Sequence, residues 1–169
     1  MDGEYVIGIT GHRRLAAERV SALSASVLAL YGESAAKYDA VTVMSSLAEG
    51  ADSLCARLAI GAGLRLVVPL PVDAAEYRKD FAGSAAAEFD ELLSLAAEAF
   101  VAPHYEQCPP APPRGFFYRQ AGIHVAKYCD VLLAIWNGVE TNTADGAGTW
   151  ETIKLARVYG KPEVLLLSG

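Results

Sequence analysis

Six short runs of apolar residues, rich in leucine and β-branched side chains, alternate along this chain with segments of helical period. The runs cover residues 5–10, 40–44, 64–70, 99–102, 131–136 and 163–167. Most of them lack alternating polar residues, which is typical of parallel strands covered on both faces. Between them, residues such as Val20, Leu23 and Val27 follow helical spacing. The alternation predicts an α/β fold, a Rossmann-like three-layer sandwich with a mostly parallel sheet of about six strands and helices on both faces.

The chain length and charge limit the domain count and the partners. With 169 residues, 53% of them hydrophobic, we expect a single domain over residues 1–169, either complete or excised from a longer protein. A net charge of −6 and scattered basic residues argue against nucleic acid as a partner. The longest apolar stretch, 64–72, is too short to span a bilayer, and the acidic start MDGEYV differs from a signal peptide. We therefore expect a cytoplasmic protein with no membrane partner.

The cysteines and histidines do not form a metal-binding pattern. Cys55, Cys108 and Cys129 are far apart and lack CxxC spacing, and His124 has no second ligand at suitable helical spacing. The sequence also lacks the GxGxxG pattern of dinucleotide-binding folds and the GxxxxGK[ST] phosphate loop. We expect no metal ion and no cofactor.

A glycine-rich turn, ADGAGTWE, follows the run at 131–136 and leads directly into a helical segment. Gly146 and Gly148 let the backbone approach a ligand closely, and the first amides of the helix are unpaired, so the turn could bind an anion. Thr149 would donate its hydroxyl and its amide. Glu151 could orient a ribose or act as a general base, although a glutamate in the first turn is also favoured by the helix dipole. The competing interpretation is an ordinary loop.

A second candidate loop, GITGHRRL, follows the first apolar run, where we expect the first helix to begin. Basic side chains at a helix N-terminus are unfavourable unless an anion offsets them. Gly11 would let the backbone approach a phosphate, Arg13 would bind it with two donors, and His12 would add a further hydrogen bond. The alternative is a solvated basic turn.

A third candidate loop, SSLAEGAD, follows the run at 40–44. Ser46 could bind a phosphate or ribose, although capping of the next helix is the commoner role of such a serine. Glu49 could accept hydrogen bonds from ribose hydroxyls or a base amine. Asp52 suits the first turn of a helix, and we favour a structural role for it. Elsewhere, Arg119 either reaches over the strand ends to a phosphate or lies on a solvated helix face.

Together, the segments GITGHR, SSLAEGAD, YCDVLLAIWNG and GAGTWETIKLA resemble the SLOG superfamily of Rossmann-like nucleotide-binding domains. This superfamily includes the DNA-processing protein DprA, the LOG phosphoribohydrolases and many nucleotide sensors. The resemblance implies the fold and a nucleotide or phosphoribosyl ligand. It does not imply N-glycosidic hydrolysis, because Ala144 and Asp145 replace the Pro and first Gly of the LOG pattern PGGxGTxxE. Thr152 also stands where that pattern has its catalytic Glu.

These observations lead to one main functional hypothesis and two alternatives. The main one is a sensor or carrier domain that binds a nucleotide-like small molecule where the strands end. The first alternative is a phosphoribohydrolase that cleaves the N-glycosidic bond of a nucleoside monophosphate, with Glu151 as its catalytic residue and Arg119 as a weaker candidate. The second is a domain that binds only protein partners. Under each of them we expect a homodimer or a higher homo-oligomer.

Overall fold

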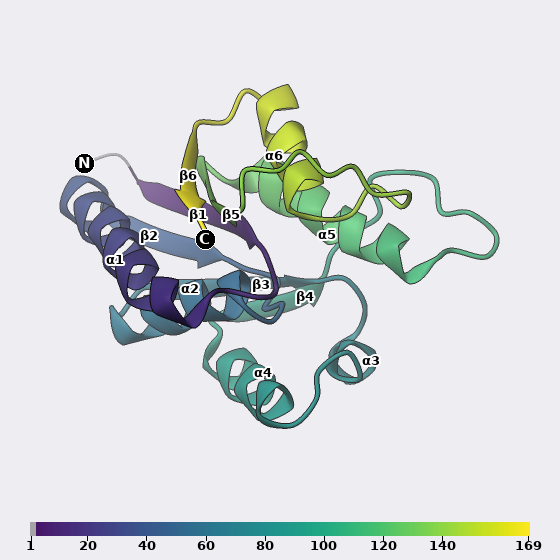
Figure 1. The fold of residues 1–169 in the computed structure, drawn as a ribbon, viewed down its shortest axis with the longest axis horizontal. Coiled ribbons are helices and arrows are strands. Elements are labelled where there is room, and N and C mark those ends of the chain that lie inside the picture. The colour runs from purple at the N-terminus through teal and green to yellow at the C-terminus, as the bar shows by residue number, and fades with distance from the viewer. Residues whose placement is uncertain (1–2) are drawn as a thin grey trace.

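The computed structural model describes residues 3–169 and contains a six-stranded sheet in the order β4-β3-β2-β1-β5-β6, with every neighbouring pair parallel (Figure 1). The strands are β1 (Glu4–Gly11), β2 (Ala40–Met44), β3 (Arg65–Leu70), β4 (Glu98–Val101), β5 (Val131–Trp136) and β6 (Glu163–Leu167). β2, β5 and β6 have the predicted bounds, β3 differs from its predicted run by one residue at its start, and β1 and β4 differ by one residue at each end. The predicted parallel α/β sheet is confirmed.

The sheet separates two helical layers, each with its own apolar core. The helices are α1 (Val20–Lys37), α2 (Ala51–Gly61), α3 (Ala74–Arg78), α4 (Ser84–Leu95), α5 (Arg114–Tyr128) and α6 (Thr149–Val158), with a 3-10 turn η1 (Ala17–Arg19). On β5, Leu133 and Ile135 pack into the core shared with α1, α2 and α4, whereas Leu132 and Ala134 pack toward α5 and α6. α1 and α2 accordingly lie on the opposite side of the sheet from α5 and α6 (Figure 1).

The first helix begins later than the sequence predicts. α1 starts at Val20, whereas His12, Arg13 and Arg14 belong to the preceding segment. The dipole of α1 therefore does not act on these basic side chains, because its effect falls off within the first turn. If these basic residues bind an anion, the reason is their position after β1, next to the ends of the neighbouring strands.

That place is the point where the strand order changes direction. β1 pairs with β2 on one side and with β5 on the other. After β1 the chain continues to β2 and on toward β4, whereas after β5 it continues to β6, in the opposite direction along the sheet. In open parallel sheets, ligands bind at this switch point, beyond the carboxyl ends of the strands. The segments after β1, β2 and β5 are the three candidate loops of the sequence. The fold thus brings them to the same edge of the sheet.

Two further features concern membranes and metals. None of the helices within residues 3–169 is both long and apolar enough to cross a bilayer. In the same part of the chain, no three His, Cys, Asp or Glu side chains are grouped to hold a metal ion. Cys55 and Cys129 are buried free thiols, and Cys108 is an exposed one.

Candidate functional site

A cleft of about 1010 Å³ lies at the carboxyl ends of the central strands. Its walls include the end of β1 and the first turns of α2, α5 and α6, which place three helix N-termini around one space. Because a helix N-terminus carries partial positive charge and unpaired amides, this arrangement favours an anionic group. Six predicted ligand residues line the cleft: Gly11, His12, Arg13, Ser46, Gly148 and Thr149.

The N-terminus of α6 provides free donors in this cleft. The first amide that bonds back into the helix is that of Thr152, which donates to the Gly148 carbonyl at 3.0 Å. The amides of Thr149, Trp150 and Glu151 donate to no acceptor within residues 3–169, and no side chain caps the helix. Thr149 is only 7% exposed, and its hydroxyl has no hydrogen-bond partner in the described chain. This turn therefore has unused hydrogen-bonding capacity where a ligand can reach it.

The turn before α6 differs from the prediction in one respect. The Gly146 amide donates to the Thr143 carbonyl at 3.2 Å, and the Ala147 amide donates to Asp145 Oδ1 at 3.0 Å. Gly146 has a φ of +69° and does not line the cleft. The protein's own acceptors thus occupy the first half of the predicted anion-binding turn. The unoccupied donors begin only at the N-terminus of α6.

His12 joins the end of β1 to its neighbours. Its amide donates to the Ile135 carbonyl of β5 at 3.1 Å, and its carbonyl accepts from the Ala51 amide at the start of α2 at 3.1 Å. The Nε2 atom is shielded from solvent and has no partner among the described residues. A buried ring nitrogen without a partner costs free energy, so it marks a place where a ligand atom could supply the missing hydrogen bond.

Gly11 lines the cleft for a different reason from the one the sequence suggested. A Cβ at this position would clash with the Cβ of Ala51 and would lie 2.7 Å from the Ile135 carbonyl oxygen. The missing side chain therefore lets β1, β5 and α2 pack closely together. Close packing of the strand and the helix explains this glycine without a ligand.

Arg13 and the tyrosines form an aromatic wall of the cleft. The guanidinium of Arg13 lies over the Tyr118 ring, 5.4 Å from its centroid, and Tyr77 and Tyr118 both line the cleft. Of the three successive aromatic residues 116–118 in the first turns of α5, Tyr118 alone lines this space. Phe116 and Phe117 pack against His104 instead.

The loop after β2 leaves Ser46 free. Ser45, not Ser46, stabilises the loop, because its hydroxyl donates to the Asp52 carbonyl at 3.0 Å and accepts from the Leu47 amide at 3.2 Å. Gly50 precedes the first turn of α2, and no side chain caps that helix. Ser46 lines the cleft, and its hydroxyl has no hydrogen-bond partner within the described part of the chain. The capping role expected for Ser46 is wrong, because the helix begins five residues later, at Ala51.

Asp52 also lines the cleft, although the sequence favoured a purely structural role for it. It lies in the first turn of α2 and is 7% exposed. Its Oδ2 atom accepts from the Ala48 amide at 3.3 Å. Burial raises the pKa of its carboxyl to about 7, against the opposing effects of that hydrogen bond and of the Arg13 charge. A site of this kind could not be recognised from sequence, because an aspartate in a first turn is usually solvated.

The structure does not bring three other predicted residues into the cleft. Glu49 is exposed and lines a separate, smaller hollow. Glu151 is not part of the cleft lining; its carboxylate accepts from the Thr143 amide at 3.4 Å and pairs with Lys154 at 3.0 Å. Arg119 pairs with Glu106 at 2.8 Å and donates to the Gly146 carbonyl at 3.0 Å. Glu151 and Arg119 therefore hold the 137–148 segment in place.

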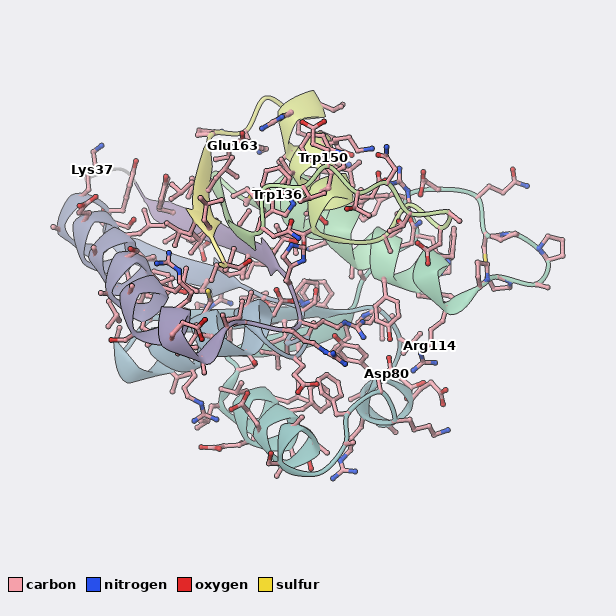
Figure 2. All side chains as sticks on the ribbon, viewed as in Figure 1. Lys37, Asp80, Arg114, Trp136, Trp150 and Glu163 are labelled. Atoms are coloured by element: carbon pink, nitrogen blue, oxygen red, sulfur yellow. The ribbon has the colours of Figure 1, made fainter. Side chains whose placement is uncertain are left out.

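Several residues of the cleft were not predicted. Trp136 and Trp150, which line it, stack with their rings 5.4 Å apart and nearly parallel, and Figure 2 shows them side by side at β5 and α6. Arg114, at the start of α5, pairs with Asp80 at 2.8 Å, as Figure 2 also shows. The sequence marks Trp136 only as a strand residue, and its contact with Trp150 depends on how the intervening loop folds.

Comparison with solved structures shows the same fold in three proteins. The chain matches DNA processing protein A (DprA) of Streptococcus pneumoniae with a TM-score of 0.61 and 15% identity, over 95% of this chain and 50% of that protein. It matches DprA of Helicobacter pylori with a TM-score of 0.61 and 16% identity, over 95% of this chain and 64% of that one. For TM1055, a structural genomics target, the TM-score is 0.51 at 21% identity, over 96% and 72% of the two chains. The chain thus spans half of the first protein and less than two thirds of the second. No protein-family model and no curated protein matches the sequence.

The comparison corrects our prediction about nucleic acid. The Helicobacter pylori DprA structure describes a single-stranded DNA binding mode, so a protein of this fold binds nucleic acid. Our exclusion of nucleic acid partners, drawn from the net charge of −6, is therefore wrong. Net charge is a property of the whole molecule, whereas binding of a strand depends on the donors and cations at one surface. Here helix N-termini and Arg13 gather at one cleft despite the acidic composition.

Proposed function

We propose that this domain binds a phosphate-containing, nucleotide-like small molecule in the cleft, as a sensor or carrier. The observation that carries the proposal is the first turn of α6, where the amides of Thr149 to Glu151 and the Thr149 hydroxyl have no partner within residues 3–169. Main-chain amides at a helix N-terminus are a general phosphate-binding arrangement. A phosphate on Thr149 and Trp150 would satisfy them.

Other unpaired groups around the same space support a polyoxygen ligand. Thr10, on β1, lines the cleft, is 8% exposed, and has a hydroxyl without a partner in the described chain. The Nε2 atom of His12 and the hydroxyl of Ser46 also lack partners there. Among these atoms His12 Nε2 is the one shielded from solvent, and buried polar atoms are nearly always hydrogen-bonded in folded proteins. The hydroxyls of Thr10 and Ser46 are open to the cleft, and a small number of placed polar groups is typical of a ligand site. Arg13 would add a positive charge at the opening.

Calorimetry with wild-type protein and the Thr149→Val variant tests this proposal. We expect a nucleoside 5′-monophosphate to bind wild type and to bind the variant roughly tenfold or more weakly, because a hydrogen bond to a charged group is lost. The matched control is Thr42→Val, whose hydroxyl bonds to Glu4 away from the cleft and whose loss should leave the affinity unchanged. Equal affinities of wild type and Thr149→Val for every phosphate ligand would refute the proposal.

Single-stranded DNA is a second candidate ligand, favoured by the DNA-binding mode described for Helicobacter pylori DprA. Its phosphodiester groups could use the same amides of α6. Adding oligothymidylate to the calorimetric panel separates the two cases. Tighter binding of the oligonucleotide than of any mononucleotide would favour this second function.

The hydrolase alternative has less support. Glu151 is not part of the cleft lining, and its carboxylate is engaged by the Thr143 amide and by Lys154, so it is poorly placed to stabilise charge on a ribose or to activate water there. Release of free base from AMP, abolished by Glu151→Gln, would restore this alternative. The expected homodimer or higher homo-oligomer stays a prediction, which sedimentation velocity tests.

A further inference from the structure

Asp52 has an oxygen that is free to face a ligand. Its Oδ2 atom accepts from the Ala48 amide at 3.3 Å, whereas Oδ1 has no hydrogen-bond partner within residues 3–169. The residue is more than nine-tenths buried and lines the cleft. A desolvated carboxylate oxygen is stabilised strongly by a donor, so the cleft favours a ligand that brings a hydroxyl or an amine to this point.

The other acidic side chains near the cleft do not offer such an acceptor. Asp145 also lines the cleft, but unlike Asp52 it is exposed to solvent; its Oδ1 accepts from the Ala147 amide, and its Oδ2 packs tightly against Gly115 at the start of α5. Glu49 and Glu151, which the sequence suggested for ribose recognition, lie outside the cleft lining. Asp52 is therefore the carboxylate placed to accept from a ligand.

The position of Asp52 relative to the proposed phosphate site limits which donor it meets. Asp52 follows β2, the phosphate donors of α6 follow β5, and β1 lies between these two strands. Adjacent strands are about 4.8 Å apart, so the carboxyl ends of β2 and β5 are separated by roughly two such spacings, and the first turns of α2 and α6 line the same cleft beyond them. In a nucleoside 5′-phosphate the sugar follows the phosphate directly and the base lies farther away. The first donors that reach Asp52 are therefore the sugar hydroxyls.

The aromatic wall leaves a place for the remainder of such a ligand. Tyr77 and Tyr118 line the cleft together with Asp52, and Arg13 lies over the Tyr118 ring. A planar base beyond the sugar could pack against these rings, since aromatic faces tolerate any base. The wall would hold a nucleoside without selecting its base.

We propose that Asp52 accepts a hydrogen bond from the ribose 2′-hydroxyl of the bound nucleotide, so that the cleft selects ribonucleotides over 2′-deoxyribonucleotides. This inference rests on the proposed function, because it takes the phosphate to lie on the N-terminus of α6. It assigns the sugar selectivity to one side chain. It also separates the small-molecule ligand from DNA, which lacks this hydroxyl.

Calorimetry at pH 8, above the pKa of about 7 to which burial raises the Asp52 carboxyl, tests the inference with the four common ribonucleoside 5′-monophosphates and their 2′-deoxy counterparts. We expect wild type to bind at least one ribonucleotide about tenfold or more tightly than its deoxy partner, because a hydrogen bond to a carboxylate is lost. Asp52→Ala, which removes the acceptor, should bind both members of the pair with the affinity that wild type has for the deoxy compound. The matched control, Asp145→Asn, should keep the preference.

Two outcomes would overturn the inference while leaving phosphate binding intact. One is equal affinity of wild type for both members of every pair that binds, a result that needs no variant to fold. The other is an Asp52→Ala variant that keeps the preference for the ribonucleotide, or that loses affinity equally for both members. Failure of every nucleotide to bind wild type would instead overturn the proposed function, and this inference with it.

Discussion

At the scale of single residues, the ionisation of Asp52 makes the stability of the folded protein depend on pH. Burial raises the pKa of its carboxyl from 3.8 to about 7, and Arg13, Cys55 and Tyr77 lie close enough to interact with its charge. The unfolded chain ionises Asp52 near 3.8, so between that pH and about 7 only the folded chain holds the proton. The contribution of Asp52 to stability is therefore full below the unfolded pKa and is lost as the pH rises through the folded pKa.

The free energy of unfolding of the Asp52→Asn variant should therefore depend less on pH than that of wild type. For wild type, the free energy of unfolding should lose on the order of 2–3 kcal/mol between about pH 5 and pH 7 through this group, at about 1.36 kcal/mol per pH unit. The variant should lack that loss, since its amide does not titrate. Urea unfolding of both proteins across this range measures the difference. Parallel curves for wild type and variant would show that Asp52 is ionised in the folded protein throughout.

A second residue-scale prediction concerns Gly11. A Cβ there would meet Ala51 and the Ile135 carbonyl, so Gly11→Ala must push α2 away from the sheet. We expect a loss of about 3 kcal/mol of unfolding free energy, at the upper end of overpacking effects, because backbone atoms cannot move aside easily. Gly32→Ala is the matched control, since nothing lies within 4 Å of that position on α1, and it should stabilise by about 0.5–1 kcal/mol. Thermal melts that rank the two variants in the opposite order would contradict this explanation.

At the scale of elements, Arg119 fixes the loop between β5 and α6. Its guanidinium joins Glu106 to the Gly146 carbonyl and so ties the 137–148 segment to α5. In Arg119→Ala we expect faster amide hydrogen exchange across that segment, with little change in β1 or β2 and a stability loss of about 1 kcal/mol. Arg78→Ala, which removes a surface pair with Asp90, is the control and should leave the loop unchanged. Unaltered exchange in the loop of Arg119→Ala would mean that other contacts hold it.

The elements also show what the sequence could predict. β5 was predicted to the residue because its six positions are all buried, and a strand covered on both faces is apolar throughout. The start of α1 was missed because the segment from His12 to Ala16 has no pattern of its own and follows contacts of His12 with β5 and α2. In the same way, the Gly146 and Ala147 amides are used by Thr143 and Asp145, a result of loop folding that glycine spacing does not reveal.

At the scale of the whole molecule, the net charge and the cleft have opposite effects on an anionic ligand. A charge of −6 repels anions at long range, whereas the α6 amides and Arg13 attract a phosphate at short range. Salt screens the long-range part most strongly, because exposed charges interact over about 10 Å at 0.1 M ionic strength. The affinity for a mononucleotide should therefore depend little on salt.

Salt dependence then shows how many phosphates a longer ligand engages. For oligothymidylate, the logarithm of the binding constant should fall with the logarithm of salt concentration by roughly 0.7 for each phosphate that the protein neutralises. Arg114 is paired with Glu76 and Asp80, whereas Arg13 of the cleft lining has no carboxylate partner within residues 3–169. We therefore expect a slope no steeper than about one, close to that for a single phosphate. Titrations at several salt concentrations, monitored by the fluorescence of the stacked Trp136 and Trp150, measure it. A slope of three or more would require basic side chains outside the cleft to track the strand, and would make an extended DNA surface rather than a single anion site the main binding feature of this molecule.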